Sequence, residues 1–153
     1  MAHHPLDIPL RHLADTVDDE WESIAQLLRD HAGADFGDHL TLSTGAWHMR
    51  HAVEVFRLHA RTTMRALGAP DALIDAIPSD KDPIPADMTA MRDALRADIA
   101  RFSDWARTLP PEALATRFKY GRDTDFVQML GMMTRHISWH TAAAHYWRKW
   151  RAQ

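Results

Sequence analysis

His136 and His140 lie one helical turn apart in the stretch Met129–Trp150, whose other inward-facing positions are Met, Ile, Ala and Trp. Side chains at i and i+4 project from the same side of a helix, so two imidazoles at this spacing can bind one metal ion. At about 100° per residue, both fall roughly 20° to either side of Met129 and Trp147, the middle of the apolar face. We therefore expect both imidazoles to point into the core.

A third imidazole is available from an earlier helix, which contains the sequence Trp47-His48-Met49-Arg50-His51. The apolar face of that helix is centred nearer to His59 and His48 than to His51, which lies at its border. Helical spacing alone therefore leaves the third ligand open among these three residues. A metal ion would satisfy histidines that must otherwise find polar partners on an apolar face.

Other polar and aromatic residues have more ordinary interpretations. We expect the remaining helical histidines to be solvated or structural: His12, His31, His39 and His145. Three carboxylates could reach the imidazoles or a bound water: Glu54, Glu20 and Asp18. Charged residues on helices are usually solvated, however, and this is the more ordinary interpretation of all three. Aromatic residues that can line a substrate pocket, or simply fill the core, are Trp47, Trp139 and Trp147.

Three neutral imidazoles leave at least one coordination position vacant, which is the open, catalytic type of metal site. Zinc in such a site lowers the pKa of bound water to about 7, and a bound thiol would be held as its thiolate. Imidazole suits several metals; we favour zinc or nickel, with iron as an alternative. The chain has no cysteine, so any thiol must be a small molecule.

The apolar pattern predicts four long helices around this site. The first is capped by Asp7 and ends near Gly33, and the second starts near Ser43 or Thr44 and stops at Gly68. The residues that give the first helix its period are Leu10, Leu13, Val17, Trp21, Ile24 and Leu28.

A proline-rich crossover, residues 69–85, separates the second helix from the third, with one helical turn at Asp71–Ala76. The third helix runs from Met88 past Trp105 until Pro110-Pro111 stops it, and a polar linker through Gly121 precedes the fourth, which Thr124 can cap. We find no alternating β pattern. The expected fold class is all-α, an antiparallel four-helix bundle.

Composition limits the function classes. A chain of 153 residues with 46% hydrophobic and 25% charged residues is typical of one globular domain spanning residues 1–153. The net charge of -3 and scattered basic residues argue against nucleic acid as a partner. No apolar run is long enough to span a membrane, and the start lacks a signal-peptide core, so we expect a cytoplasmic protein.

The motifs also resemble those of a known family. Trp47-His48-Met49-Arg50-His51 early in the second helix and His136-Ile137-Ser138-Trp139-His140 in the fourth are similar to the DinB/YfiT-like superfamily of metal-binding four-helix bundles. The likeness covers nearly the whole chain, including the long crossover between the second and third helices. By resemblance to the DinB-like domain of ergothioneine-type sulfoxide synthases, the second histidine of the first motif is the ligand.

This resemblance implies the metal ligands His51, His136 and His140, with His48 as the fallback for His51. It also implies a divalent metal, frequent dimerisation, here as a homodimer, and transfer or isomerisation that depends on a low-molecular-weight thiol. The synthases carry a Glu two residues after the last ligand where this chain has Ala142, so sulfoxide synthesis is not expected. The expectation is a metal-dependent thiol transferase, isomerase or hydrolase acting on a small-molecule substrate. The alternative is a non-enzymatic metal- or ligand-binding bundle, either stress-associated or a scaffold.

Overall fold

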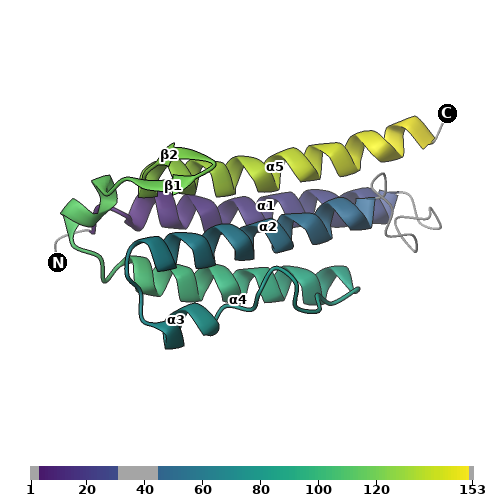
Figure 1. The fold of residues 1–153 in the computed structure, drawn as a ribbon. Coiled ribbons are helices and arrows are strands. Elements are labelled where there is room, and N and C mark those ends of the chain that lie inside the picture. Colours follow the sequence, from purple (N-terminus) through teal and green to yellow (C-terminus); the bar gives the residue numbers. More distant parts are fainter. Residues whose placement is uncertain (1–3, 31–44, 152–153) are drawn as a thin grey trace.

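The computed structural model describes the backbone of residues 4–30 and 45–151, and the side chains of residues 4–20 and 47–143. The described chain is mostly helical, which confirms the predicted all-α class (Figure 1). In chain order, its elements are α1 (Asp7–Asp30), α2 (Gly45–Ala66), α3 (Asp71–Asp75), α4 (Met88–Ala106), the 3-10 turn η1 (Pro111–Ala115), β1 (Phe118–Tyr120), β2 (Arg122–Thr124) and α5 (Phe126–Arg151).

The four long helices lie side by side along the length of the molecule (Figure 1). Helix α5 packs against α1 and α2, and α4 packs against the same two helices from the other side. Helices α1 and α5 run in one direction and α2 and α4 in the other, because the crossover returns along the molecule before α4 begins. Among the described helices, none is both long enough and apolar enough to cross a membrane.

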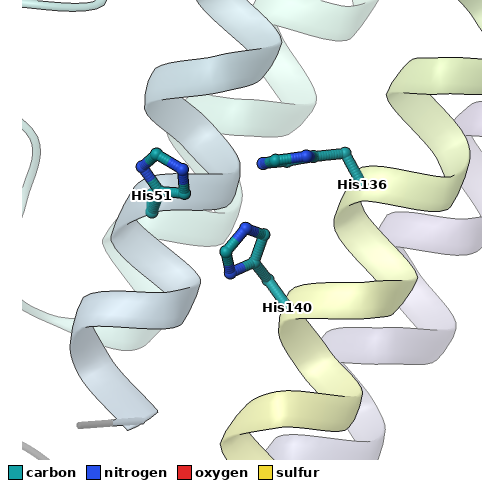
Figure 2. Close-up of side chains that lie close together, drawn as sticks. All are labelled: His51, His136 and His140. Atoms are coloured by element: carbon teal, nitrogen blue, oxygen red, sulfur yellow. The ribbon is translucent and has the colours of Figure 1, made fainter. Parts of the chain in front are cut away.

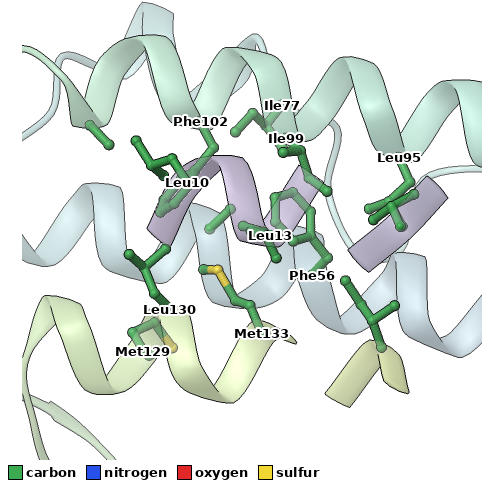
Figure 3. Packing of buried hydrophobic residues seen from close by; sticks show 14 of the residues in the cluster. Leu10, Leu13, Phe56, Ile77, Leu95, Ile99, Phe102, Met129, Leu130 and Met133 are labelled. Carbon is green, nitrogen blue, oxygen red and sulfur yellow. The ribbon is translucent and has the colours of Figure 1, made fainter. Parts of the chain in front are cut away.

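The core is formed by apolar side chains from all four long helices (Figure 3). Its centre is aromatic: Phe56 of α2 meets Phe102 of α4 edge to face at 6.1 Å, and Phe102 stacks on Phe126 of α5 at 5.9 Å. Residues that carry the predicted helical period and are fully buried include Leu10, Leu13, Val17, Met91, Leu95, Ile99 and Phe102. Burial of one face of each helix is therefore what holds the four together.

The crossover begins where the sequence predicts. Gly68 has a φ of +75°, and the Ala69 N–H donates to the Met64 carbonyl over 2.9 Å, which closes the end of α2. Helix α3 then forms within the predicted turn. The Arg61 guanidinium of α2 donates to the carbonyls of Ile74, over 2.8 Å, and Ile77, which fastens the crossover to the side of α2.

Two predicted helix starts differ in detail. Asp7 is the first residue of α1 rather than its cap, and its carboxylate reaches back to accept the His4 N–H over 3.0 Å. At α5 the cap is Asp125, not Thr124: its Oδ1 accepts the Gln128 N–H over 2.8 Å, and Gln128 Oε1 accepts the Asp125 N–H over 3.2 Å. In this reciprocal pair, each side chain accepts the backbone N–H of the other residue, so two N–H groups of the first turn gain a hydrogen-bond partner. The predicted boundaries at Gly33, Ser43 and Thr44 lie outside the described residues.

The linker before α5 contains a short antiparallel hairpin that we did not predict. Strands β1 and β2 pair with Phe118 opposite Thr124 and Tyr120 opposite Arg122. The turn between them is Gly121, whose φ of +67° favours glycine. The hairpin places Tyr120 against α2, close to the histidines described next.

Candidate metal centre

Helices α2 and α5 bring three histidines together where they pack against each other. His51 comes from α2, His136 and His140 come from successive turns of α5, and one ring nitrogen from each lies within 4.8 Å of the others. Figure 2 shows the three rings pointing toward a common space between the two helices. Nitrogens bound to one zinc ion are roughly 3.3 Å apart, from Zn–N bonds of about 2.0–2.1 Å, so small ring rotations would complete a site.

The three rings converge instead of stacking. The centroids of His136 and His140 are 4.4 Å apart at 54°, and His51 lies 5.4 Å from His136 and 4.8 Å from His140, at 57° and 72°. Ring angles of this kind also occur in aromatic packing. What favours metal binding is that one nitrogen from each ring lies within 4.8 Å of the other two.

Two nitrogens in this group are buried and lack a hydrogen-bond partner, namely Nε2 of His136 and Nε2 of His140. His140 is 1% exposed, so water does not reach its Nε2 from outside. Leaving buried polar atoms unsatisfied is costly, and native structures rarely do so without a reason. A metal ion bound to both Nε2 atoms would explain why they lack hydrogen-bond partners, and imidazole nitrogens are common ligands of transition metals.

His51 is held by its own neighbours on α2. Its Nδ1 lies 3.3 Å from Oε2 of Glu54, whose other oxygen accepts a hydrogen bond from Arg50 over 3.2 Å. When Nδ1 donates to this carboxylate, the lone pair is on Nε2, the atom free for a metal. Trp47 stacks on the His51 ring at 4.7 Å and 12°, which restricts the rotation of that ring.

The other two candidates on α2 lie on either side of this group. His48 is half-buried, and its Nδ1 is 2.9 Å from Nδ1 of His140. His59 is 5% exposed and packs edge to face against Tyr120 at 5.1 Å and against His136 at 6.1 Å. Neither belongs to the group of three. The sequence indicates His48 only as an alternative ligand and does not predict its contact with His140. The i,i+3 spacing between His48 and His51 is the signal that places both near the same face of α5.

The other residues that the sequence suggests for the site lie around or away from the three histidines. Asp18 pairs with Arg96 of α4 over 3.1 Å, and neither Asp18 nor Glu20 belongs to the histidine group. Trp139 is 62% exposed and meets His140 edge-on at 4.6 Å, so it flanks the site. The side chains of Trp147 and His145, and residues His31 and His39, lie outside the described part of the chain.

Burial favours the neutral form of four imidazoles in this region, those of His48, His59, His136 and His140. Burial first, and then positive charge on His136, His51 and His48, lowers the pKa of His140 to about 3. Burial, then His136, lowers the pKa of His59 to about 4. The pKa values of His136 and His48 are also lowered, by burial first and His51 second. At neutral pH these rings therefore present the lone pairs that a metal requires.

These pKa shifts predict that the metal-free protein loses stability on mild acidification. The unfolded chain binds protons at histidine below the ordinary histidine pKa of 6.5, whereas folded His59 and His140 do not until about 4 and 3. Unfolding then takes up protons, so the free energy of unfolding falls as pH drops below 6.5, by about 1 kcal/mol per pH unit for each of the two residues. Urea unfolding at pH 7, 6 and 5 measures how the free energy of unfolding depends on pH. In a His59→Leu variant this free energy should fall less steeply as the pH drops. Equal stability of the wild type at all three pH values would contradict the lowered pKa values.

Comparisons with known protein families, with curated proteins and with solved structures find no match to this chain. The resemblance to the DinB/YfiT-like superfamily therefore depends on the two histidine motifs and the order of the helices alone.

Proposed function

We propose that this protein binds one divalent transition metal, zinc or nickel, through His51, His136 and His140, within an antiparallel four-helix bundle of the DinB/YfiT-like type. The proposed role is that of a metal-dependent enzyme, in which the site activates a small thiol or water for transfer to an electrophilic substrate. The observation that supports it most directly is the pair of buried, unpartnered Nε2 atoms facing a third imidazole.

The enzymatic part of the proposal follows from the number and type of ligands. Structural zinc sites are closed by four protein ligands, whereas three histidines leave a position for an external molecule. When bound, the metal would supply a lowered pKa for a coordinated water or thiol. The chain's own contribution is to hold three imidazole rings in place, with Glu54 orienting His51 and Trp47 stacking on it. With no cysteine in the sequence, the thiol must come from solution.

The first test is the metal content of protein purified without a histidine tag. We expect uptake of about one equivalent of zinc or nickel per chain, measured by elemental analysis and by titration of metal-free protein. Less than about a tenth of an equivalent, with no uptake on titration, would remove the proposal.

A second measurement separates the chemistries. A panel of small thiols is tested with an electrophile: turnover that needs the thiol supports transfer, and turnover with water alone supports hydrolysis. Stoichiometric metal with no turnover in either assay would favour the non-enzymatic metal-binding bundle instead.

A further inference from the structure

His48 and His140 make a contact that places a chemical constraint on both rings. Their Nδ1 atoms are 2.9 Å apart, a hydrogen-bond distance, so the two nitrogens share one proton. One ring must therefore donate from Nδ1 and the other must accept at Nδ1. In a pair of neutral imidazoles, the donor ring has its lone pair on Nε2 and the acceptor ring carries its proton there.

The surroundings of His140 decide which ring donates in a metal-binding protein. If His140 accepted at Nδ1, its Nε2 would carry a proton into a buried space where no hydrogen-bond partner exists. If His140 donates from Nδ1, its Nε2 carries a lone pair directed toward the space shared with His136 and His51. Only the second arrangement allows Nε2 to bind a metal.

We propose that His48 is a positioning residue that accepts the Nδ1 proton of His140 and thereby holds His140 in the tautomer whose Nε2 binds the metal. This inference rests on the proposed metal site. It gives His140 the same support that Glu54 gives His51, where the carboxylate accepts at Nδ1. Because His48 is a neutral acceptor, it orients the ring without adding a negative charge beside the metal.

Neighbouring aromatic rings hold His48 in position for this role. Trp47 meets the His48 ring edge-on at 5.0 Å and 79°, and Trp139 of α5 meets it at 6.3 Å and 83°. The two indoles limit rotation of the His48 ring, which keeps its Nδ1 directed at His140. A side chain that filled the same space without an acceptor would preserve packing and lose only the hydrogen bond.

The test compares two replacements of His48. In His48→Asn, the amide oxygen can take the place of Nδ1 as acceptor; in His48→Leu, a side chain of similar bulk cannot accept. We expect the leucine variant to bind zinc about 10- to 100-fold more weakly than the wild type and the asparagine variant to recover most of that loss, by competition with a chromophoric chelator. Circular dichroism checks that both variants keep their helices, and His59→Leu is the matched control because His59 borders His136 without contacting Nδ1 of His140.

Nitrogen chemical shifts of the His140 ring in metal-free protein give a readout that does not depend on the metal. We expect the Nδ1–H form in the wild type and in His48→Asn, and an increase in the Nε2–H form in His48→Leu. Unchanged tautomer and zinc affinity in His48→Leu would overturn the inference, as would equal losses in both variants, which would indicate packing alone. If the wild type takes up no metal, the proposed function fails. The His140 tautomer, compared between the wild type and His48→Leu, still shows whether His48 sets the position of the proton on the His140 ring.

Discussion

Replacing His140 with alanine is expected to abolish stoichiometric metal binding while the protein remains helical. His140 is the most buried of the three proposed ligands and lies closest to both others, so its loss leaves two imidazoles on different helices. Structural zinc sites with four ligands have binding free energies of about 10–16 kcal/mol, or about 3 kcal/mol per ligand, so we expect at least a hundredfold weaker binding. Alanine favours the helical backbone, so α5 should persist.

The measurement is a titration of metal-free protein with zinc or nickel, together with circular dichroism to follow helix content. The matched control is His59→Ala, because His59 is 5% exposed, borders His136 and lies outside the ligand group. It should bind one equivalent of metal. Wild-type affinity in His140→Ala would show that the ligand assignment is wrong, and loss of binding in both variants would show that any disturbance of this region empties the site.

Helical spacing in the sequence points directly to the α5 pair of this candidate site and leaves the α2 member open, for a geometric reason. His136 and His140 share one side of α5 with the buried residue Met129, and a helical wheel locates that side directly. On α2 the centre of the buried face is occupied by Met49, Ala52, Val53 and Phe56. His51 lies well away from the centre of that face and is only partly buried, so helical spacing on α2 does not identify it as a ligand.

Repetition of a pattern also decides which parts of the fold the sequence predicts. Long helices repeat their apolar period many times, and Gly68 marks the end of α2 because its positive φ suits only glycine without strain. The hairpin of β1 and β2 has three residues in each strand, too few for an alternating pattern to appear. The predicted α5 cap, Thr124, differs from the observed one by a single residue, since Thr124 and Asp125 are both good capping residues. The position of Gln128, three residues after Asp125, decides between them.

A buried ion pair between α2 and α4 is a feature that no local pattern predicts. Arg57 Nε donates to Asp98 Oδ2 over 2.8 Å, and the two side chains are only 4% and 2% exposed. Both residues are charged, and charged side chains are almost never fully buried unless they are paired, so the sequence favours exposed positions for both. Their partnership depends on how α2 and α4 are rotated against each other, which only the packed structure reveals.

Replacing Asp98 with alanine is expected to lower the free energy of unfolding by about 3–5 kcal/mol, because it leaves the Arg57 charge buried without its partner. Arg57 already has one buried, unpartnered nitrogen, Nη1, so it has little hydrogen bonding in reserve. Denaturant unfolding of the metal-free protein measures the change without any contribution from the site. Arg101→Ala is the matched control: Arg101 also bonds Asp98, over 2.9 Å, but it is half-exposed, and its loss should cost less than about 1 kcal/mol.

The double replacement Arg57→Met with Asp98→Leu separates the contribution of the pair from the penalty of an orphaned charge. If the large effect of Asp98→Ala comes from the orphaned guanidinium, removing both charges should recover most of the lost stability, because similar apolar volume avoids the desolvation cost. A double variant as unstable as Asp98→Ala would mean that the ion pair itself stabilises the contact between α2 and α4. Stability within about 1 kcal/mol of the wild type in Asp98→Ala would mean that Arg57 reaches water when its partner is lost.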